Sequence, residues 1–179
     1  MNNYDLLAFD SSFAAVDSSL SCREVSESDF DAVLDIESAS FEFPWSRQDF
    51  EFCLDLEQCG ALVAECNGKI VGYVVYEARR NSVRLLSCAV VESERRSGVG
   101  SFLLHQLADR LGKNRSQIVC IVRERNVTAQ LFLRSLGFRA QWINRRFYSS
   151  AEEDAYRMTW RLDNSCLLGF EYEQARQVG

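Results

Sequence analysis

Apolar residues in the first third of the chain are spaced as in a strand followed by two helices. Residues 20–25 are predicted to form a short strand. Ser26, with an acidic residue three positions later, is typical of a helix start, and apolar positions with helical spacing follow it. This helix must stop before the Phe43-Pro44-Trp45 segment, which holds the only proline. Ser46 then begins a second helix that extends to about residue 58.

Beyond residue 60 the pattern indicates strands that alternate with two further helices. Asn67-Gly68, the favoured pair for a two-residue turn, joins predicted strands at 61–66 and 69–78. Gly137 is placed to end a helix in the preferred left-handed conformation. The remaining predicted elements are strands at 83–91, 117–123, 138–148 and 155–162, and helices at 98–111 and 127–136.

This order of elements predicts an α/β domain with a central mixed, twisted sheet of about seven strands flanked by about four helices. The strand-helix-strand unit over 83–123 is expected to form a parallel pair with a right-handed crossover. We expect the domain to cover residues 21–162. Residues 1–20 are then an N-terminal extension and residues 163–179 a C-terminal tail.

The composition of the 179-residue chain is that of an ordinary globular protein, and its charge narrows the range of partners. A net charge of −6 disfavours nonspecific binding to nucleic acid or to an anionic membrane. The start of the chain lacks the pattern of a signal peptide, and no apolar run is long enough to span a bilayer. We therefore expect a soluble, cytoplasmic protein, monomeric or homodimeric. The seven cysteines form no C-x-x-C pair, so no metal site is predicted.

The segment Arg95-Arg96-Ser97-Gly98-Val99-Gly100 has the features of a cradle for a pyrophosphate group. Gly98 and Gly100 allow backbone N–H groups to approach a ligand closely. The predicted helix that follows contributes unpaired N–H donors and the positive end of its dipole. Arg95 and Arg96 add two permanent positive charges that suit phosphate oxygens. Without this context, two glycines at this spacing more often form a structural turn.

The loop and its neighbours resemble the GNAT superfamily of N-acetyltransferases. Arg95-x-x-Gly98-x-Gly100 matches the family's coenzyme A loop, and Leu136-Gly137-Phe138 resembles the end of a characteristic helix. The resemblance implies that Cys88, Ala89 and Val90 pair through their backbone with the acetyl and pantetheine part of acetyl-coenzyme A. It also implies that Asn126 contacts this cofactor, which is the acetyl donor in the family.

Within the superfamily, the chain most resembles the alanine N-terminal acetyltransferases that act on ribosomal proteins. Phe43-Pro44-Trp45-Ser46 matches the substrate-side loop of these enzymes. The resemblance implies direct transfer of an acetyl group to the N-terminal amine of a protein or peptide, with Phe43, Pro44 and Trp45 on the substrate side. An alternative for Phe43 and Trp45 is a hydrophobic cluster that only packs the loop.

The chain departs from this subfamily at the two positions that transfer protons. The glutamate that helps to deprotonate the amine is replaced by Ile121, and the tyrosine that protonates the thiolate is replaced by Leu133. Neither side chain can carry a proton. Tyr148 is the best candidate for a substitute acid and Glu124 for a substitute base. A structural residue of the sheet and a solvated ion pair are their respective alternatives.

This departure leaves three alternatives. In the first, the enzyme uses other groups for proton transfer, such as Tyr148 and Glu124. In the second, water carries the protons, and in the third the chain is a coenzyme A-binding module with little turnover. A small-molecule amine is an alternative acceptor. A nucleotide-binding role is the least favoured, because the loop lacks the Gly-Lys-Ser/Thr ending of a P-loop.

Overall fold

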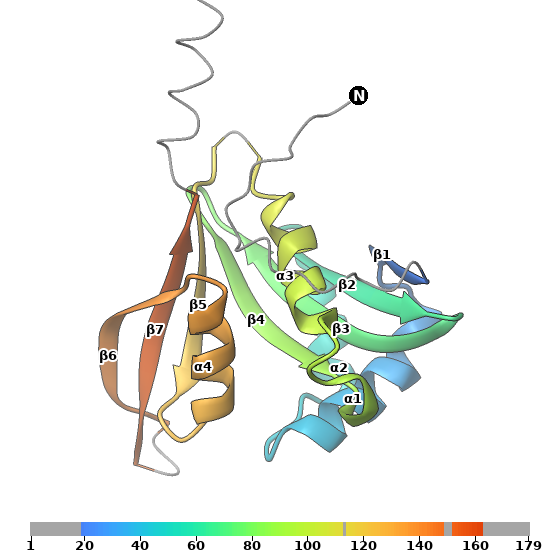
Figure 1. The fold of residues 1–179 in the computed structure, drawn as a ribbon, viewed down its shortest axis with the longest axis horizontal. Helices are drawn as coiled ribbons and strands as arrows, with labels where there is room; N and C mark the ends of the chain where they lie inside the picture. Colours follow the sequence, from blue (N-terminus) through green and yellow to red (C-terminus); the bar gives the residue numbers. More distant parts are fainter. Residues whose placement is uncertain (1–18, 113, 149–151, 163–179) are drawn as a thin grey trace, which may run out of the picture.

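One mixed sheet runs through the domain, and the spatial order of its strands differs from their order in the chain (Figure 1). The computed structural model describes residues 19–112, 114–148 and 152–162. The described strands lie in the order β1-β2-β3-β4-β5-β7-β6. They are β1 (Leu20–Glu24), β2 (Cys59–Cys66), β3 (Lys69–Ala78), β4 (Val83–Val90), β5 (Gln117–Arg123), β6 (Arg139–Tyr148) and β7 (Glu153–Arg161).

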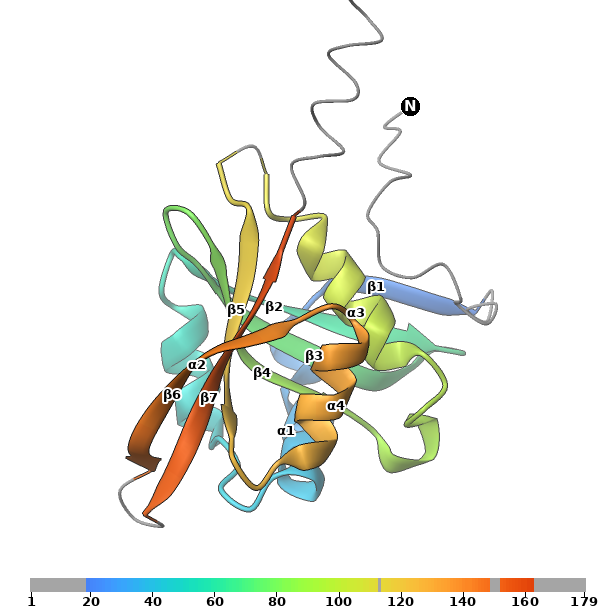
Figure 2. The ribbon, with the colours of Figure 1, turned by 60° about the vertical axis from the view of Figure 1, so that its left-hand side comes forward.

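Helices cover both faces of this sheet (Figures 1 and 2). The described α-helices are α1 (Phe30–Ser40), α2 (Arg47–Leu54), α3 (Val99–Ala108) and α4 (Val127–Ser135). Single 3-10 turns at Glu27–Asp29 and Glu92–Glu94 precede α1 and the loop before α3. The fold therefore confirms the predicted α/β class, with seven strands and four helices in the part that the structure describes.

Alternation along the central strands produces two cores, one on each face of the sheet. On β2, Leu62 belongs to the core that includes α3 and α4, whereas its neighbour Val63 belongs to the core that includes α1 and α2. On β3, Val74 and Val75 divide in the same way. All four side chains are fully buried.

Local sequence explains most element boundaries, and the largest differences lie at the ends of two helices. Ser46 and Asp49 form the reciprocal capping box that begins α2. Helix α2 ends at Leu54 rather than near residue 58, because the Gln58 carbonyl already accepts a hydrogen bond from the Ala78 amide of β3. Helix α3 similarly ends before residue 111, in a tighter turn followed by a left-handed glycine.

The parallel pair formed by β4 and β5 is short, and its shortness creates the space for a site. The two strands pair only through Val83–Leu85 and Ile118–Cys120, as predicted for this strand-helix-strand unit. Beyond these residues they separate, while β4 stays paired with β3 as far as Val90. The separation is visible between the labels β4 and β5 in Figure 1.

Candidate active site

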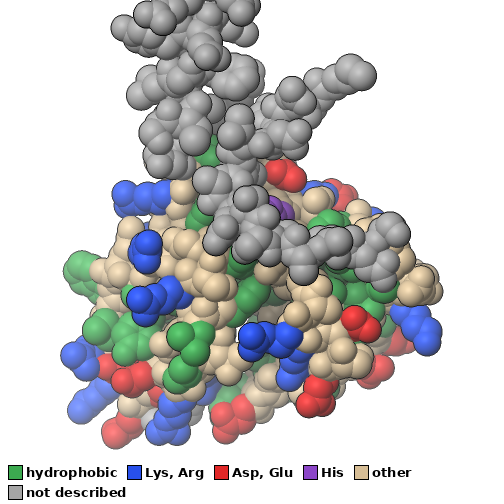
Figure 3. Space-filling model, in the orientation of Figure 1, with side chains coloured by type: hydrophobic (Ala, Val, Ile, Leu, Met, Phe, Trp, Pro, Cys, Tyr) green, Lys and Arg blue, Asp and Glu red, His purple; other side chains and the backbone are tan. Residues whose placement is uncertain are grey.

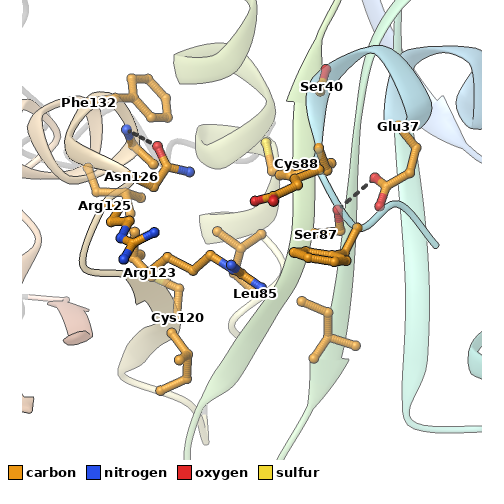
Figure 4. Close-up of a pocket in the computed structure, with 18 of the residues that line it drawn as sticks. Glu37, Ser40, Leu85, Ser87, Cys88, Cys120, Arg123, Arg125, Asn126 and Phe132 are labelled. Carbon is orange, nitrogen blue, oxygen red and sulfur yellow. Dashed lines mark hydrogen bonds between the residues drawn. The ribbon is translucent and has the colours of Figure 1, made fainter. Parts of the chain in front are cut away.

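A cavity of about 1050 Å³ lies where β4 and β5 separate. One wall consists of β4 and α1 with the loop that follows α1, and the other consists of β5 and α4. The far ends of β6 and β7 contribute Tyr148 and Glu153. Figure 4 looks into this space, with Glu37, Ser87 and Cys88 on one side and Arg123, Arg125 and Asn126 on the other.

The β5 and α4 wall is apolar at the positions where the resemblance predicts missing proton carriers. Ile121 on β5 is half-buried and Leu133 on α4 is buried, and both line the cavity. Phe132 lines it beside them. The cavity lining therefore carries no proton carrier at either of these two positions.

Arg123 joins the two sides of the cavity at one end. Its guanidinium lies 5.0 Å from the centre of the Phe43 ring and 4.1 Å from that of the Tyr148 ring. One Glu153 carboxylate oxygen accepts from Arg123 at 3.1 Å, and the other accepts from the Arg125 amide at 2.9 Å. Glu153 is buried, so these donors compensate the loss of water around its charge.

Tyr148 stands in the cavity, whereas Glu124 does not. Burial is the main reason why the pKa of Tyr148 is raised above its ordinary value of 10, although Arg123 opposes the shift. Tyr148 therefore keeps its proton at neutral pH. Glu124 is exposed and absent from the cavity lining, because its backbone is tied to Asp154 and Gln130 at the end of β5 and its side chain faces solvent. The structure does not bring the two predicted proton carriers together.

The opposite wall contains a buried polar group that sequence reasoning missed. Glu37 on α1 is 2% exposed and lines the cavity. Its carboxylate accepts from the hydroxyl groups of Tyr73 and Ser87, the latter at 3.1 Å. Burial raises the pKa of Glu37. The one sequence signal was its place on the apolar face of α1, four residues beyond the buried Val33.

The substrate-side loop predicted at residues 43–45 reaches the mouth of the cavity with two of its three side chains. Phe43 and Trp45 line the cavity, while Pro44 is exposed and lies outside the lining. The Trp45 amide donates to Glu37 at 2.9 Å, and its ring packs edge-on against Phe50 at 5.2 Å. Trp45 thus anchors the loop, and Phe43, 60% exposed, is left at the opening.

The glycine loop lies at the end of β4 and has the backbone conformation that its glycines permit. Gly98 has a φ of 97°, and nothing lies within 4 Å of the place where its Cβ would stand. A Cβ on Gly100 would meet the Phe132 ring at 3.1 Å, so Gly100 is needed for packing against α4. Arg96 also has a positive φ of 67°. Helix α3 begins here, and its first N–H groups have no partner within the helix.

The other polar groups of the loop hold it in place. Arg95 donates to the Val90 carbonyl and to Ser40, both at 3.2 Å. The Ser97 hydroxyl donates to the Glu94 carbonyl at 2.6 Å. Val99 is buried in the core. These contacts connect the loop to β4 and α1. Both arginines are exposed, but Arg95 is held by these hydrogen bonds to Val90 and Ser40.

The other residues predicted to contact the cofactor divide between β4 and α4. Cys88 and Asn126 line the cavity, and Ala89 and Val90 continue β4 toward the glycine loop. Asn126 caps α4 by accepting from the Ala129 amide at 3.0 Å. Burial raises the pKa of the Cys88 thiol to about 12, so it is protonated and unsuited to act as a nucleophile.

Charged and sulfur-containing side chains do not gather into a metal site in the part of the chain that the structure describes. Within that part no group of three potential ligands is placed to hold a metal ion, and the six described cysteines are free. On the face in Figure 3, basic and acidic side chains are interspersed. None of the described helices is long and apolar enough to cross a membrane.

Comparisons with known proteins agree with this architecture. The model of the acetyltransferase (GNAT) family matches residues 30–138. The [ribosomal protein bS18]-alanine N-acetyltransferase of Escherichia coli is 29% identical over 130 residues, which cover 71% of this chain and 87% of that protein. An uncharacterised N-acetyltransferase of Methanocaldococcus jannaschii is 29% identical over 133 residues, which cover 73% and 85%.

A solved structure gives the same result in three dimensions. The crystal structure of the ribosomal-protein-S18-alanine N-acetyltransferase from Escherichia coli superposes with a TM-score of 0.72 at 26% identity. The match covers 80% of this chain and 94% of that one.

Proposed function

Because the chain belongs to the GNAT acetyltransferase family and is an N-acetyltransferase, we propose that it uses acetyl-coenzyme A to acetylate the N-terminal amine of a protein or peptide. The observation that carries this proposal is the cavity between β4 and β5, which opens beside Phe43 and Trp45 and extends along β4. A similar enzyme of Escherichia coli is named for its action on an alanine terminus of a ribosomal protein.

The glycine loop and the adjoining strand fit the donor. The open space over Gly98, the unpaired N–H groups at the start of α3 and the exposed Arg96 suit a pyrophosphate group. Cys88 to Val90 and Asn126 would hold the remainder of the cofactor. Bound acetyl-coenzyme A supplies an activated acetyl thioester. A backbone N–H of β4 beyond Leu85, where the strand is unpaired with β5, would stabilise negative charge on the acetyl oxygen.

The mouth of the cavity fits a chain terminus as acceptor. The cavity of about 1050 Å³ would hold the acetyl end of the donor together with the first residues of an acceptor. Phe43 presents an exposed ring at the opening, a surface on which apolar side chains of a peptide can rest. Tyr148, protonated at neutral pH, is the candidate donor of a proton to the departing thiolate.

The proposal is tested by incubating the protein with acetyl-coenzyme A and peptides that differ in their first residues, and by following the release of free thiol. Peptides blocked at the N-terminus serve as the control, because they lack the proposed nucleophile. We expect thiol release with free termini only. Release with small primary amines but with no peptide would replace the proposed acceptor class. Coenzyme A binding by calorimetry without any thiol release would favour a binding module.

A further inference from the structure

On the β4 wall, a serine hydroxyl is hydrogen-bonded to a buried carboxylate at the edge of the cavity. Ser87 is 8% exposed and Glu37 is 2% exposed, and both line the cavity. The Ser87 Oγ donates to Glu37 Oε2 at 3.1 Å, as the dashed line in Figure 4 shows. In that view both side chains lie across the cavity from Arg123 and Asn126.

Every hydrogen bond that reaches Glu37 is one that an ionised carboxylate accepts. The Trp45 amide donates to Oε1 at 2.9 Å, and the hydroxyls of Tyr73 and Ser87 donate to Oε2. A carboxylate has no hydrogen to give, so this set of three donors fits its charged form. The Ser87 hydroxyl lies 3.1 Å from Glu37 Oε2 and 2.9 Å from the Tyr73 hydroxyl. When its hydrogen is directed to Glu37, the Ser87 oxygen has a lone pair that can accept a proton from the cavity side.

We propose that Ser87 and Glu37 form the proton acceptor for the incoming amine, on the wall opposite Ile121. The inference rests on the proposed acetylation of an amine. An acceptor that arrives as an ammonium gives one proton to the Ser87 oxygen while the Ser87 hydrogen passes to Glu37. One N–H bond and one serine O–H bond break, and two O–H bonds form. Ser87 is neutral before and after, Glu37 becomes a carboxylic acid, and the amine is left neutral. The proton returns to water before the next cycle.

The surroundings of Glu37 favour this role. The groups that face its carboxylate are Tyr73 from β3, Ser87 from β4 and the Trp45 amide from the loop, and none of these is charged at neutral pH. Burial away from compensating charge raises the pKa of Glu37, opposed by its hydrogen bonds from Trp45 and Ser87. A carboxylate with a raised pKa is a stronger base than an exposed one. The relay works only while Glu37 is ionised, so kcat falls as the pH drops through this raised pKa.

Two variants separate a relay from a merely structural carboxylate. Each removes one of the two hydroxyls that donate to Glu37 Oε2, and with it the 2.9 Å contact between these hydroxyls. Ser87→Ala removes the hydroxyl between Glu37 and the cavity. Tyr73→Phe removes a hydroxyl on the buried side and keeps the ring that packs against Phe50. We expect Ser87→Ala to lower kcat ~10²-fold with unchanged coenzyme A affinity, as for loss of a general base. Tyr73→Phe is expected to change kcat less than ~3-fold. Its kcat should still fall at low pH, which is the acid limb of the profile of kcat against pH. Equal losses in both variants would overturn the relay.

Glu37→Gln provides the second measurement, because glutamine fills the same space without basicity. We expect kcat to fall ~10²-fold and the acid limb to disappear, while thermal unfolding shows that the protein is folded. Carbon-13 NMR of labelled glutamate, with the Glu37 signal identified by its loss in Glu37→Gln, gives a readout independent of turnover. The Glu37 carboxyl should titrate above the ordinary glutamate range. Titration within that range, or a retained acid limb in Glu37→Gln, contradicts the proposal.

Assays with two kinds of acceptor distinguish a failure of the relay from a failure of the proposed function. All variants are assayed with a free N-terminal peptide and with a small primary amine. If the wild type acetylates only the small amine, the proposed acceptor is wrong, and the ratios between variants still decide the relay. If the wild type acetylates peptides and Ser87→Ala matches it, the relay alone fails.

Discussion

The two walls of the cavity carry different kinds of chemistry. The wall of β5 and α4 presents apolar side chains, among them Ile121 and Leu133. The wall of β4 and α1 presents Ser87 and, behind it, the buried carboxylate of Glu37. A carboxylate costs free energy to bury, and this cost is offset here by three hydrogen bonds from three different segments. In the proposed relay, the proton acceptor lies on the wall of β4 and α1, opposite the wall that carries Ile121.

The largest expected effect is that of removing both members of the relay. If Ser87 and Glu37 act in series, either substitution alone stops proton transfer through the relay, so the second substitution causes no further loss of rate. Glu37→Gln combined with Ser87→Ala should then lose ~10²-fold in kcat, about as much as either change alone. Steady-state rates of the wild type, both single variants and the double variant provide the cycle. A double variant whose loss is the product of the two single losses would show that the groups act independently.

A smaller effect is expected from returning a carboxylate to the apolar wall. Ile121 is half-buried and lines the cavity, so Ile121→Glu places a base across from the broken relay. In the Glu37→Gln background we expect kcat to recover ~10-fold, a part of the range that a general base supplies. Ile121→Gln in the same background is the matched control and should recover nothing. Equal rates for the two changes would remove the support for a base at this wall.

Loss of the Tyr148 hydroxyl is expected to lower kcat by less. A thiolate leaves readily because the thiol pKa is near ~8.5, so we expect Tyr148→Phe to cost about 3–10-fold. The tyrosine must be protonated to donate, and burial raises its pKa above 10. Wild-type kcat should therefore decline on the basic side only above pH 10 on account of this group. An unchanged kcat in Tyr148→Phe over the whole pH range would show that Tyr148 is only a structural residue.

The smallest effect on turnover is expected from a substitution in the glycine loop, because this loop is proposed to bind the pyrophosphate through backbone N–H groups. Gly98 and Gly68 both have positive φ, and at both sites the position of a Cβ is free of neighbours. Substitution by alanine should lower the free energy of unfolding at each site by ~1–2 kcal/mol. Only Gly98→Ala should weaken coenzyme A binding, several-fold by calorimetry, with kcat at saturation retained. Equal coenzyme A affinities in the two variants would show that the pyrophosphate does not bind at Gly98.

The sequence predicted the fold well because the signals that carry it are local. Alternation in residues 61–66 and 69–78, the Asn67-Gly68 turn and the Ser46 cap all appear in the structure at or near their predicted positions. The helix ends that were misplaced depend on contacts with other elements, such as the bond from Ala78 to Gln58 that ends α2 early. A local pattern contains no information about such a bond.

For the site, the sequence indicated groups that are neighbours in the chain and missed groups that meet only in the fold. The glycine loop occupies six consecutive residues, and Gly98 has the positive φ that a glycine permits, while the role of the loop as a pyrophosphate cradle stays a prediction. Glu124 was chosen for its charge next to the Arg123 position, but the end of β5 turns it to solvent. Glu37 was missed because its partners Tyr73 and Ser87 are 36 and 50 residues away in the chain.

The sequence by itself determined the order of elements, the split into core-facing and exposed positions and the loop that ends β4. It also determined that Ile121 and Leu133 carry no exchangeable proton. Only the tertiary structure decided which polar groups face the cavity in their place. The physical reason is that burial and hydrogen bonding change the basicity of a carboxylate, and both are set by side chains that come together only when α1, β3 and β4 pack.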